Sequence, residues 1–227
     1  MSQILPNVHM VDATKGSNVY IIIDNGVTLI DTGMGKNTSN VLAELKRLGF
    51  EKKDIKNIII THAHVDHYQC LAKLKEGTNA RVMVGEADAD FVEGKVSMPM
   101  PKGAIGIIFR LLKPIMKSKP VPVDVRLKDG DTVDVLGGLK VVSLSGHTPG
   151  NIGLYQSHMK LVISSDTVGH RKGRLGLPAL FKENPSECKA AIKHLYELDA
   201  DVMLPGHGPP IMPKASEQVK AFYQGLK

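Results

Sequence analysis

The sequence has few of the residues that mark a disulfide-stapled, aromatic-rich or membrane-spanning protein. Its 227 residues include two cysteines and no tryptophan, with five phenylalanines and five tyrosines. Cys70 and Cys188 lie far apart without a C-x-x-C spacing, so we expect no disulfide framework and a reducing cytoplasmic location. The first residues lack the basic flank and apolar stretch of a secretory signal. No apolar run approaches the about 18 residues of a membrane span.

A block of one charge sign is also missing. The chain has 29 basic and 23 acidic residues, a net charge of +6, but its lysines are scattered along the sequence. Because aromatic stacking platforms are scarce as well, nucleic acid is not an expected partner. The composition, 42% hydrophobic and 23% charged, is that of an ordinary globular protein. We expect a small-molecule substrate and either a monomer or a homodimer.

The chain contains two similar halves. Residues 18–32 (NVYIIIDNGVTLIDT) and 151–167 (NIGLYQSHMKLVISSDT) each carry two apolar runs around a polar turn and end in Asp-Thr. A predicted helix follows each hairpin, opening with capping residues near Asn37 or Asn184, and then an apolar strand that ends at His62 or His207. This order predicts an α/β fold of two pseudo-equivalent halves, with helices outside and sheets packed together inside.

Shorter elements are predicted between and after the halves. They are a helix start at 65–74, a helix at 86–92, strands at 81–84 and within 124–145, and a last helix at about 214–225. Two segments fit neither half, 94–122 and 168–183. We expect one domain over 1–227, in which the apolar, Pro- and Lys-rich 94–122 segment forms either a lid over the site or an interface, with shallow membrane binding as a weaker alternative.

The stretch 61–67 (THAHVDH) carries the strongest chemical signal. His62 and His64 are two residues apart in an extended segment, so both imidazoles point to the same side. Asp66 and His67 lie where the chain turns into a helix and can aim at a neighbouring point. Four such groups would repel one another or leave buried donors unpaired unless a cation organises them. The motif therefore predicts a site for a divalent ion with nitrogen and oxygen ligands.

Three further strands end in the same residue types. His147, Asp166 and His207 each follow a short apolar run, and glycines flank His147 and His207. Side chains at the carboxyl ends of several strands converge in one crevice of layered α/β folds. The sequence thus offers seven candidate ligands, enough for two metal ions, which are His62, His64, Asp66, His67, His147, Asp166 and His207.

These motifs resemble those of the metallo-β-lactamase superfamily. The HxHxDH pattern at 62–67 is followed in the family's order by Gly146-His147-Thr148-Pro149-Gly150, Asp166 and Gly206-His207-Gly208, and residues 18–33 resemble the family's opening hairpin. The resemblance implies a four-layer αββα sandwich with an internal pseudo-twofold repeat. Within the family, the chain is similar to the core of glyoxalase II and lactonases without their extra domains.

The resemblance also implies the role of each candidate ligand. His62, His64 and His147 would hold one metal ion, Asp66, His67 and His207 the other, and Asp166 would bridge the two. Asp31 would orient a ligand from behind. We expect two divalent ions as cofactors, zinc first, with iron or manganese as alternatives.

Two such ions would leave the site positively charged and lower the pKa of bound water, so that a bridging hydroxide exists near neutrality. We therefore expect a dinuclear metal-dependent hydrolase acting on an ester, thioester, lactone or phosphodiester, a promiscuous enzyme included, with Asp66 as catalytic proton carrier. Lactam hydrolysis is disfavoured, because the lactamases most often discussed have a cysteine where Asp166 stands. Candidate substrate contacts are Tyr68, His170 and Phe109, although a half-buried structural role for Tyr68 stays open.

Two other functions stay open. An oxidoreductase similar to the family's mononuclear-iron persulfide dioxygenases would use a subset of the same ligands. A metal-binding protein without turnover would use the whole set. Metal content separates the first two, because the hydrolase predicts two zinc-like ions per chain and the oxidoreductase a single iron.

Overall fold

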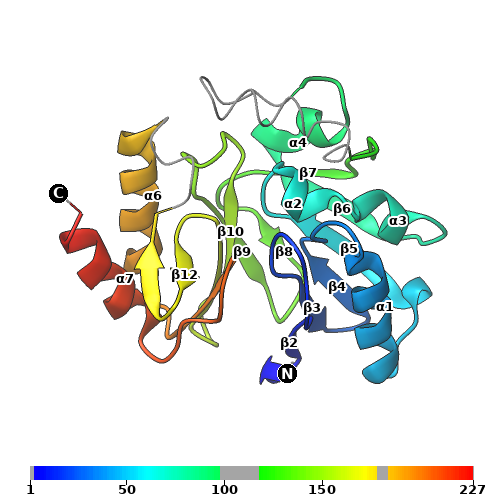
Figure 1. Cartoon of the computed structure of the whole chain (residues 1–227), viewed down its shortest axis with the longest axis horizontal. Coiled ribbons are helices and arrows are strands. Elements are labelled where there is room, and N and C mark those ends of the chain that lie inside the picture. Colours follow the sequence, from blue (N-terminus) through cyan, green and yellow to red (C-terminus); the bar gives the residue numbers. More distant parts are fainter. Residues whose placement is uncertain (1–2, 98–117, 178–183, 227) are drawn as a thin grey trace.

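A computed structural model describes residues 3–97, 118–177 and 184–226. Two β-sheets face each other at its centre, with helices on both outer sides (Figure 1). The first sheet has the strand order β1-β2-β3-β4-β5-β6-β7. Its strands are β1 (Gln3–Leu5), β2 (Val8–Met10), β3 (Tyr20–Ile23), β4 (Val27–Ile30), β5 (Ile55–Ile60), β6 (Arg81–Gly85) and β7 (Val125–Leu127).

The second sheet has the order β14-β11-β10-β9-β8. Its strands are β8 (Thr132–Val133), β9 (Leu139–Ser143), β10 (Ile152–Gln156), β11 (Leu161–Ser165) and β14 (Val202–Pro205). A separate hairpin, which the sequence did not predict, pairs β12 (Gly169–Arg171) with β13 (Arg174–Gly176).

Helices cover the outer face of each sheet. On the first sheet lie α1 (Asn37–Arg47), α2 (Val65–Tyr68), α3 (Leu71–Lys75) and α4 (Glu86–Val92), with a short 3-10 helix η1 (Lys52–Asp54), and on the second lie α6 (Pro185–Glu197) and α7 (Ala215–Gln224). Among the described residues, no helix is long and apolar enough to cross a bilayer.

Strand periodicity explains why the layers form. In β3, Tyr20 and Ile22 pack between the two sheets, whereas Ile21 packs with the helices of the first half. In β11, Ile163 faces the first sheet and Val162 packs among α6 and α7. Each sheet therefore buries both faces. Each large apolar side chain removed from water stabilises the fold by about 1.5–3 kcal/mol. This architecture confirms the predicted αββα sandwich.

The predicted internal repeat is present in the strand connections. An antiparallel hairpin, a crossover helix and a parallel strand follow one another as β3-β4-α1-β5 in the first half and as β10-β11-α6-β14 in the second. At the end of each hairpin one residue other than glycine has a positive φ, 57° at Asp31 and 53° at Ser165. The backbone conformation of Asp31 thus recurs at Ser165, one residue before the Asp166 with which the sequence pattern pairs it.

The two predicted helix starts differ in how well their capping residues were located. Lys36, not Asn37, is the N-cap of α1, and the Asn37 side chain instead exchanges two 2.8 Å hydrogen bonds with the Lys15 backbone. Asn184 is the N-cap of α6 without a side-chain cap hydrogen bond, although Pro185 opens that helix as expected. The helix start predicted at 65–74 consists of two short helices, α2 and α3.

The described ends of the 94–122 segment meet beside α4. The Val121 amide donates to the Val92 carbonyl at 3.1 Å, and a Cβ on Gly94 would lie 2.7 Å from Pro120 Cγ. The chain therefore leaves this helix and returns to it. Residues 98–117, with Phe109, lie outside the described residues, so the lid or interface stays a prediction.

Candidate metal centre

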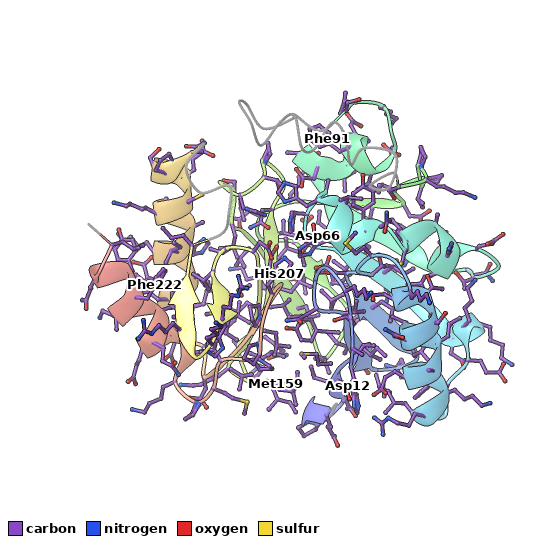
Figure 2. The ribbon with its side chains drawn as sticks, viewed as in Figure 1. Asp12, Asp66, Phe91, Met159, His207 and Phe222 are labelled. Carbon is purple, nitrogen blue, oxygen red and sulfur yellow. The ribbon has the colours of Figure 1, made fainter. Side chains whose placement is uncertain are left out.

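The ends of four strands bring the seven candidate ligands together. His62, His64, Asp66 and His67 follow β5, while His147, Asp166 and His207 follow β9, β11 and β14. Figure 2 labels Asp66 and His207, which lie close together between the two halves of the molecule. The convergence expected from the strand ends is therefore present, although neither half alone contains the complete set.

Three imidazoles form the first donor group. His62 Nε2 lies 3.0 Å from His64 Nδ1, and His64 Nδ1 lies 2.9 Å from His147 Nε2. The ring planes of each pair are steeply inclined, at 81° for His62 with His64 and 89° for His64 with His147. The three nitrogens thus point at a common position from different directions, as the ligands of a metal ion do.

A second donor group lies beside the first. His207 Nε2 is 3.3 Å from Asp66 Oδ2, and the ligand atoms of Asp66, His67 and His207 all lie within 4.8 Å of one another. Asp166 contacts both groups, with Oδ2 3.4 Å from His147 Nε2 and 3.2 Å from His207 Nε2. The Asp166 carboxylate therefore lies between the two donor groups.

Three buried side-chain atoms of this cluster, His67 Nε2, His147 Nδ1 and Asp166 Oδ1, have no hydrogen-bond partner, and two of them face each other. His67 Nε2 and Asp166 Oδ1 are buried and unpaired, and the 3.5 Å between them is too long for a good hydrogen bond. An unsatisfied buried polar atom costs about 1–3 kcal/mol. A divalent cation would satisfy both atoms, and five imidazoles with two carboxylates are a donor set suited to zinc and related ions. The residues present therefore fit a metal centre.

The electrostatics of the cluster differ between the two groups. Burial, together with the nearby His67, holds the pKa of His62 well below its usual value, and burial with His147 lowers the pKa of His64 to about 3. Burial also disfavours the charged form of His67, but the charges of Asp166 and Asp31 raise its pKa well above its usual value.

Hydrogen bonds to Asp166 and Asp66 raise the pKa of His207 to about 9. Burial works against ionisation of Asp66, but the hydrogen bond from His207 and the charge of His67 lower its pKa overall. The lowered pKa values favour the neutral form of His62 and His64, the form that binds a metal ion, whereas a cation in the second group would displace protons from His67 and His207.

Asp31 contacts His67 on the side of the ring away from Asp166. His67 Nδ1 donates to Asp31 Oδ2 at 2.8 Å, and Asp31 also accepts hydrogen bonds of 2.8 Å from the amide and the hydroxyl of Thr61. The carboxylate is 3% exposed. These contacts fix the imidazole with Nε2 directed at Asp166.

Asp88 in α4 is a positioning residue that the sequence analysis missed. Its carboxylate accepts hydrogen bonds from the Ala63 amide at 2.8 Å, the Thr148 hydroxyl at 2.7 Å and the Gly150 amide at 2.8 Å. Burial raises the pKa of Asp88 despite these three donors. One carboxylate thus ties the loop after β5 to the loop that carries His147.

We expect Asp88→Ala to lower the free energy of unfolding by about 3 kcal/mol or more, because three buried donors lose their acceptor. In a protein of this size the melting temperature should fall by about 6 °C or more. Thermal or urea denaturation measures the change. Asp90→Ala is the matched control on the same helix, since Asp90 pairs with Arg126 at the surface, where a pair contributes about 1 kcal/mol at most. Equal effects of the two variants would contradict the role of Asp88.

Asn18, also missed, holds the loop of His207 from the opposite half. Its side-chain amide donates to the carbonyls of Pro205 at 2.9 Å and Gly208 at 2.7 Å, and its backbone amide donates to the Gly206 carbonyl at 2.7 Å. The only sequence signal was the asparagine that opens both hairpins, at 18 and 151. A first-half residue therefore positions a second-half candidate ligand.

The three candidate substrate contacts lie in different parts of the chain, and the structure describes two of them. Tyr68 is half-buried and packs against the apolar cluster of the first half, and burial raises its pKa. His170 adjoins the loop of His207, where its amide donates to the His207 carbonyl at 3.2 Å and its Nδ1 lies 3.0 Å from the Pro209 carbonyl. Phe109 lies outside the described residues. Contact of any of the three with substrate stays a prediction.

Known protein sequences match this chain along most of its length. YflN, a probable metallo-hydrolase of Bacillus subtilis, is 25% identical over 219 residues, 87% of this chain and 83% of that protein. YobT of the same organism is 26% identical over 92% of this chain and 90% of its own length. A hydroxyacylglutathione hydrolase of Ruegeria pomeroyi is 27% identical over 72% of this chain but 51% of its own length.

Solved structures share the fold. A metallo-β-lactamase family protein of Thermus thermophilus superimposes with a TM-score of 0.76 at 22% identity, over 98% of this chain and 80% of that chain. BJP-1, a subclass B3 metallo-β-lactamase of Bradyrhizobium japonicum, superimposes with a TM-score of 0.72 at 24% identity, over 99% of this chain and 89% of that chain. The family model of the metallo-β-lactamase superfamily matches residues 13–207, the range that contains all seven candidate ligands. This chain belongs to the metallo-β-lactamase superfamily.

Proposed function

We propose that the chain is a dinuclear metal-dependent hydrolase of small ester, thioester, lactone or phosphodiester substrates. The observation that carries the proposal is the position of Asp166, whose Oδ2 is 3.4 Å from His147 and 3.2 Å from His207. A carboxylate between two donor groups suits a pair of cations better than one. Membership in a superfamily with relatives named metallo-hydrolases supports the general activity.

In this proposal His62, His64 and His147 hold one ion, and Asp66, His67 and His207 hold the other, with Asp166 shared. Zinc fits the donor set, and iron or manganese would use the same ligands. When bound, the ions supply hydroxide from water near neutral pH and polarise the substrate's carbonyl or phosphoryl oxygen. Asp31 orients the His67 ring through a hydrogen bond, and Asp88 and Asn18 hold two loops that carry candidate ligands.

Asp66 is the proposed proton carrier. Its side chain is 31% exposed, against 10% for Asp166, so it is the carboxylate of the pair that substrate and water can reach more easily. Asp66 Oδ2 lies 3.3 Å from His207 Nε2. We propose that Asp66 takes up, at Oδ1 or Oδ2, the proton of the attacking hydroxide and passes it to the leaving group as the bond to that group breaks.

The substrate class is proposed from chemistry and from one relative. Hydroxyacylglutathione hydrolase is the name of a relative that acts on a thioester, but this chain spans about half of that protein, so only the core reaction is carried over. The likeness to BJP-1 concerns the fold and gives no reason to expect lactam cleavage. Thioesters, esters, lactones and phosphodiesters all place a polarisable oxygen next to the scissile bond.

The test is a hydrolysis screen with quantified metal. The purified chain is loaded with Zn²⁺, Fe²⁺ or Mn²⁺ in turn and assayed on ester, thioester, lactone and phosphodiester probes, and bound metal is measured by elemental analysis. We expect two ions per chain and turnover of at least one probe. A single tightly bound iron with no hydrolysis would instead favour the oxidoreductase, and two ions with no turnover would favour a binding protein.

Metal should also stabilise the fold. Each Zn²⁺ site occupied at 100 times its dissociation constant adds about 2.7 kcal/mol, so two sites add about 5 kcal/mol and raise the melting temperature by about 10 °C or more. Thermal melts with a chelator and with Zn²⁺ measure this. His158→Ala serves as a control, because His158 is exposed and lies outside the cluster. Identical melts of the wild type with and without Zn²⁺ would contradict a metal centre.

A further inference from the structure

A buried serine adjoins the metal centre without belonging to the proposed ligand set. Ser165 ends β11, is 1% exposed and has a φ of 53°, a conformation that residues with a Cβ adopt at a cost. Its Oγ lies 3.1 Å from His62 Nδ1 and donates to Asn151 Oδ1 at 2.5 Å. The backbone conformation that Ser165 shares with Asp31 thus places a hydroxyl against the ring of a candidate ligand.

The hydrogen bonds that link Asn151, Ser165 and His62 each have a defined donor and acceptor. Asn151 Nδ2 donates to the Leu144 carbonyl at 2.7 Å, so its Oδ1 faces Ser165 and accepts the serine hydroxyl. With its proton committed to Asn151, Ser165 Oγ can only accept from His62. The second hydroxyl near this ring, Thr61 Oγ1 at 3.2 Å, donates to Asp31 at 2.8 Å and is likewise left as an acceptor.

Both neighbours of His62 Nδ1 therefore require a proton on that nitrogen. The neutral ring then carries its lone pair on Nε2, the atom that lies 3.0 Å from His64 Nδ1 in the first donor group. The other tautomer would direct an N–H into the position proposed for the cation, and its unprotonated Nδ1 would face two hydroxyl oxygens that have no proton left to donate to it. The relay thus prepares His62 as a ligand before any metal arrives.

We propose that Ser165 is a positioning residue that fixes the tautomer and orientation of His62 through the relay Leu144–Asn151–Ser165–His62. The inference rests on the proposed metal centre and deepens it. Two residues with a positive φ at the ends of the two hairpins thus support two candidate ligands: Asp31 contacts His67 with a carboxylate, whereas Ser165 contacts His62 with a neutral hydroxyl. Leu144 lies in the loop that leads to His147, so the relay ties two ligands of the first group together.

The test compares Zn²⁺ binding by the full-length wild type and by Ser165→Ala, Ser165→Gly and Ser164→Ala, using competition with a chromophoric chelator. Alanine keeps the strained φ and removes only the hydroxyl, whereas glycine removes both. Ser164 is the matched control, a buried serine of the same strand whose hydroxyl contacts the Leu204 carbonyl at 3.5 Å. We expect about 10-fold weaker binding at the first site in both Ser165 variants, and wild-type affinity in Ser164→Ala.

Two further measurements separate positioning from a merely structural role. Nitrogen-15 NMR of the metal-free chain should find His62 protonated at Nδ1 in the wild type and in Ser164→Ala, and a tautomer mixture in Ser165→Ala. Ser165→Gly should melt at a higher temperature than Ser165→Ala, yet keep the same binding defect.

Different results would overturn the role of Ser165 and the metal centre. Wild-type affinity in Ser165→Ala, or recovery of both stability and affinity in Ser165→Gly, would overturn the positioning role and leave the proposed hydrolase intact. Absence of Zn²⁺ binding by the wild-type chain would overturn the proposed metal centre and this inference with it.

Discussion

Asp166→Asn is expected to remove metal from both positions and to reduce hydrolysis by at least about 100-fold, the upper range seen when groups merely supporting a ligand are lost. Asp166 is the one carboxylate within 3.5 Å of His67, His147 and His207 among the described residues. Asparagine keeps the shape but removes the negative charge that faces three imidazoles. Metal per chain and turnover of the best probe from the screen are the measurements.

Variants of a ligand that belongs to one donor group test whether Asp166 is shared by both. His62→Ala and His207→Ala each remove a donor from one group, so each should retain more metal than Asp166→Asn, with up to one ion per chain. His194→Ala and His158→Ala are the controls, because both residues lie outside the cluster. If Asp166→Asn kept two ions and wild-type turnover, the shared position of Asp166 between the cations would be wrong.

The architecture could be predicted because its signals are local and periodic. Each half has a hairpin, a helix and a strand followed by histidine, and consecutive residues specify each of these elements. They are present as β3-β4-α1-β5 and β10-β11-α6-β14. The candidate ligands followed from the same logic, because a His or Asp directly after a strand is positioned by that strand.

The supporting residues could not be predicted, because their partners are distant in the sequence. Asn18 contacts Gly208, 190 residues away, and Ser165 contacts His62, 103 residues away. The capping predicted near Asn37 is absent for the same reason, because the Asn37 side chain is engaged by hydrogen bonds with the distant Lys15 backbone. A polar residue that repeats in both halves, as Asn18 and Asn151 do, is the one signal of this kind that the sequence offered.

The other large effect is expected of Asp66→Asn, which keeps one oxygen ligand but removes the charge and the proton acceptor. We expect turnover to fall by about 100-fold or more, the usual contribution of general acid-base catalysis. The ion held by His62, His64 and His147 should stay, because Asp66 belongs to the other donor group. Metal content should therefore lie between one and two ions per chain while turnover collapses. Asp199→Asn is the control, an aspartate 82% exposed and paired with Lys160.

A pair of substrates distinguishes proton transfer from loss of a ligand. A nitrophenyl ester has a leaving group that departs as a stable anion, whereas an alkyl ester of the same acid needs a proton on the departing oxygen. If Asp66 delivers that proton, Asp66→Asn should slow the alkyl ester far more than the nitrophenyl ester, because only the former depends on the acid. If Asp66 acts only as a ligand, both esters should slow by the same factor, since each requires the same cation pair. Equal slowing would therefore assign Asp66 to metal binding alone and leave the proton to another group.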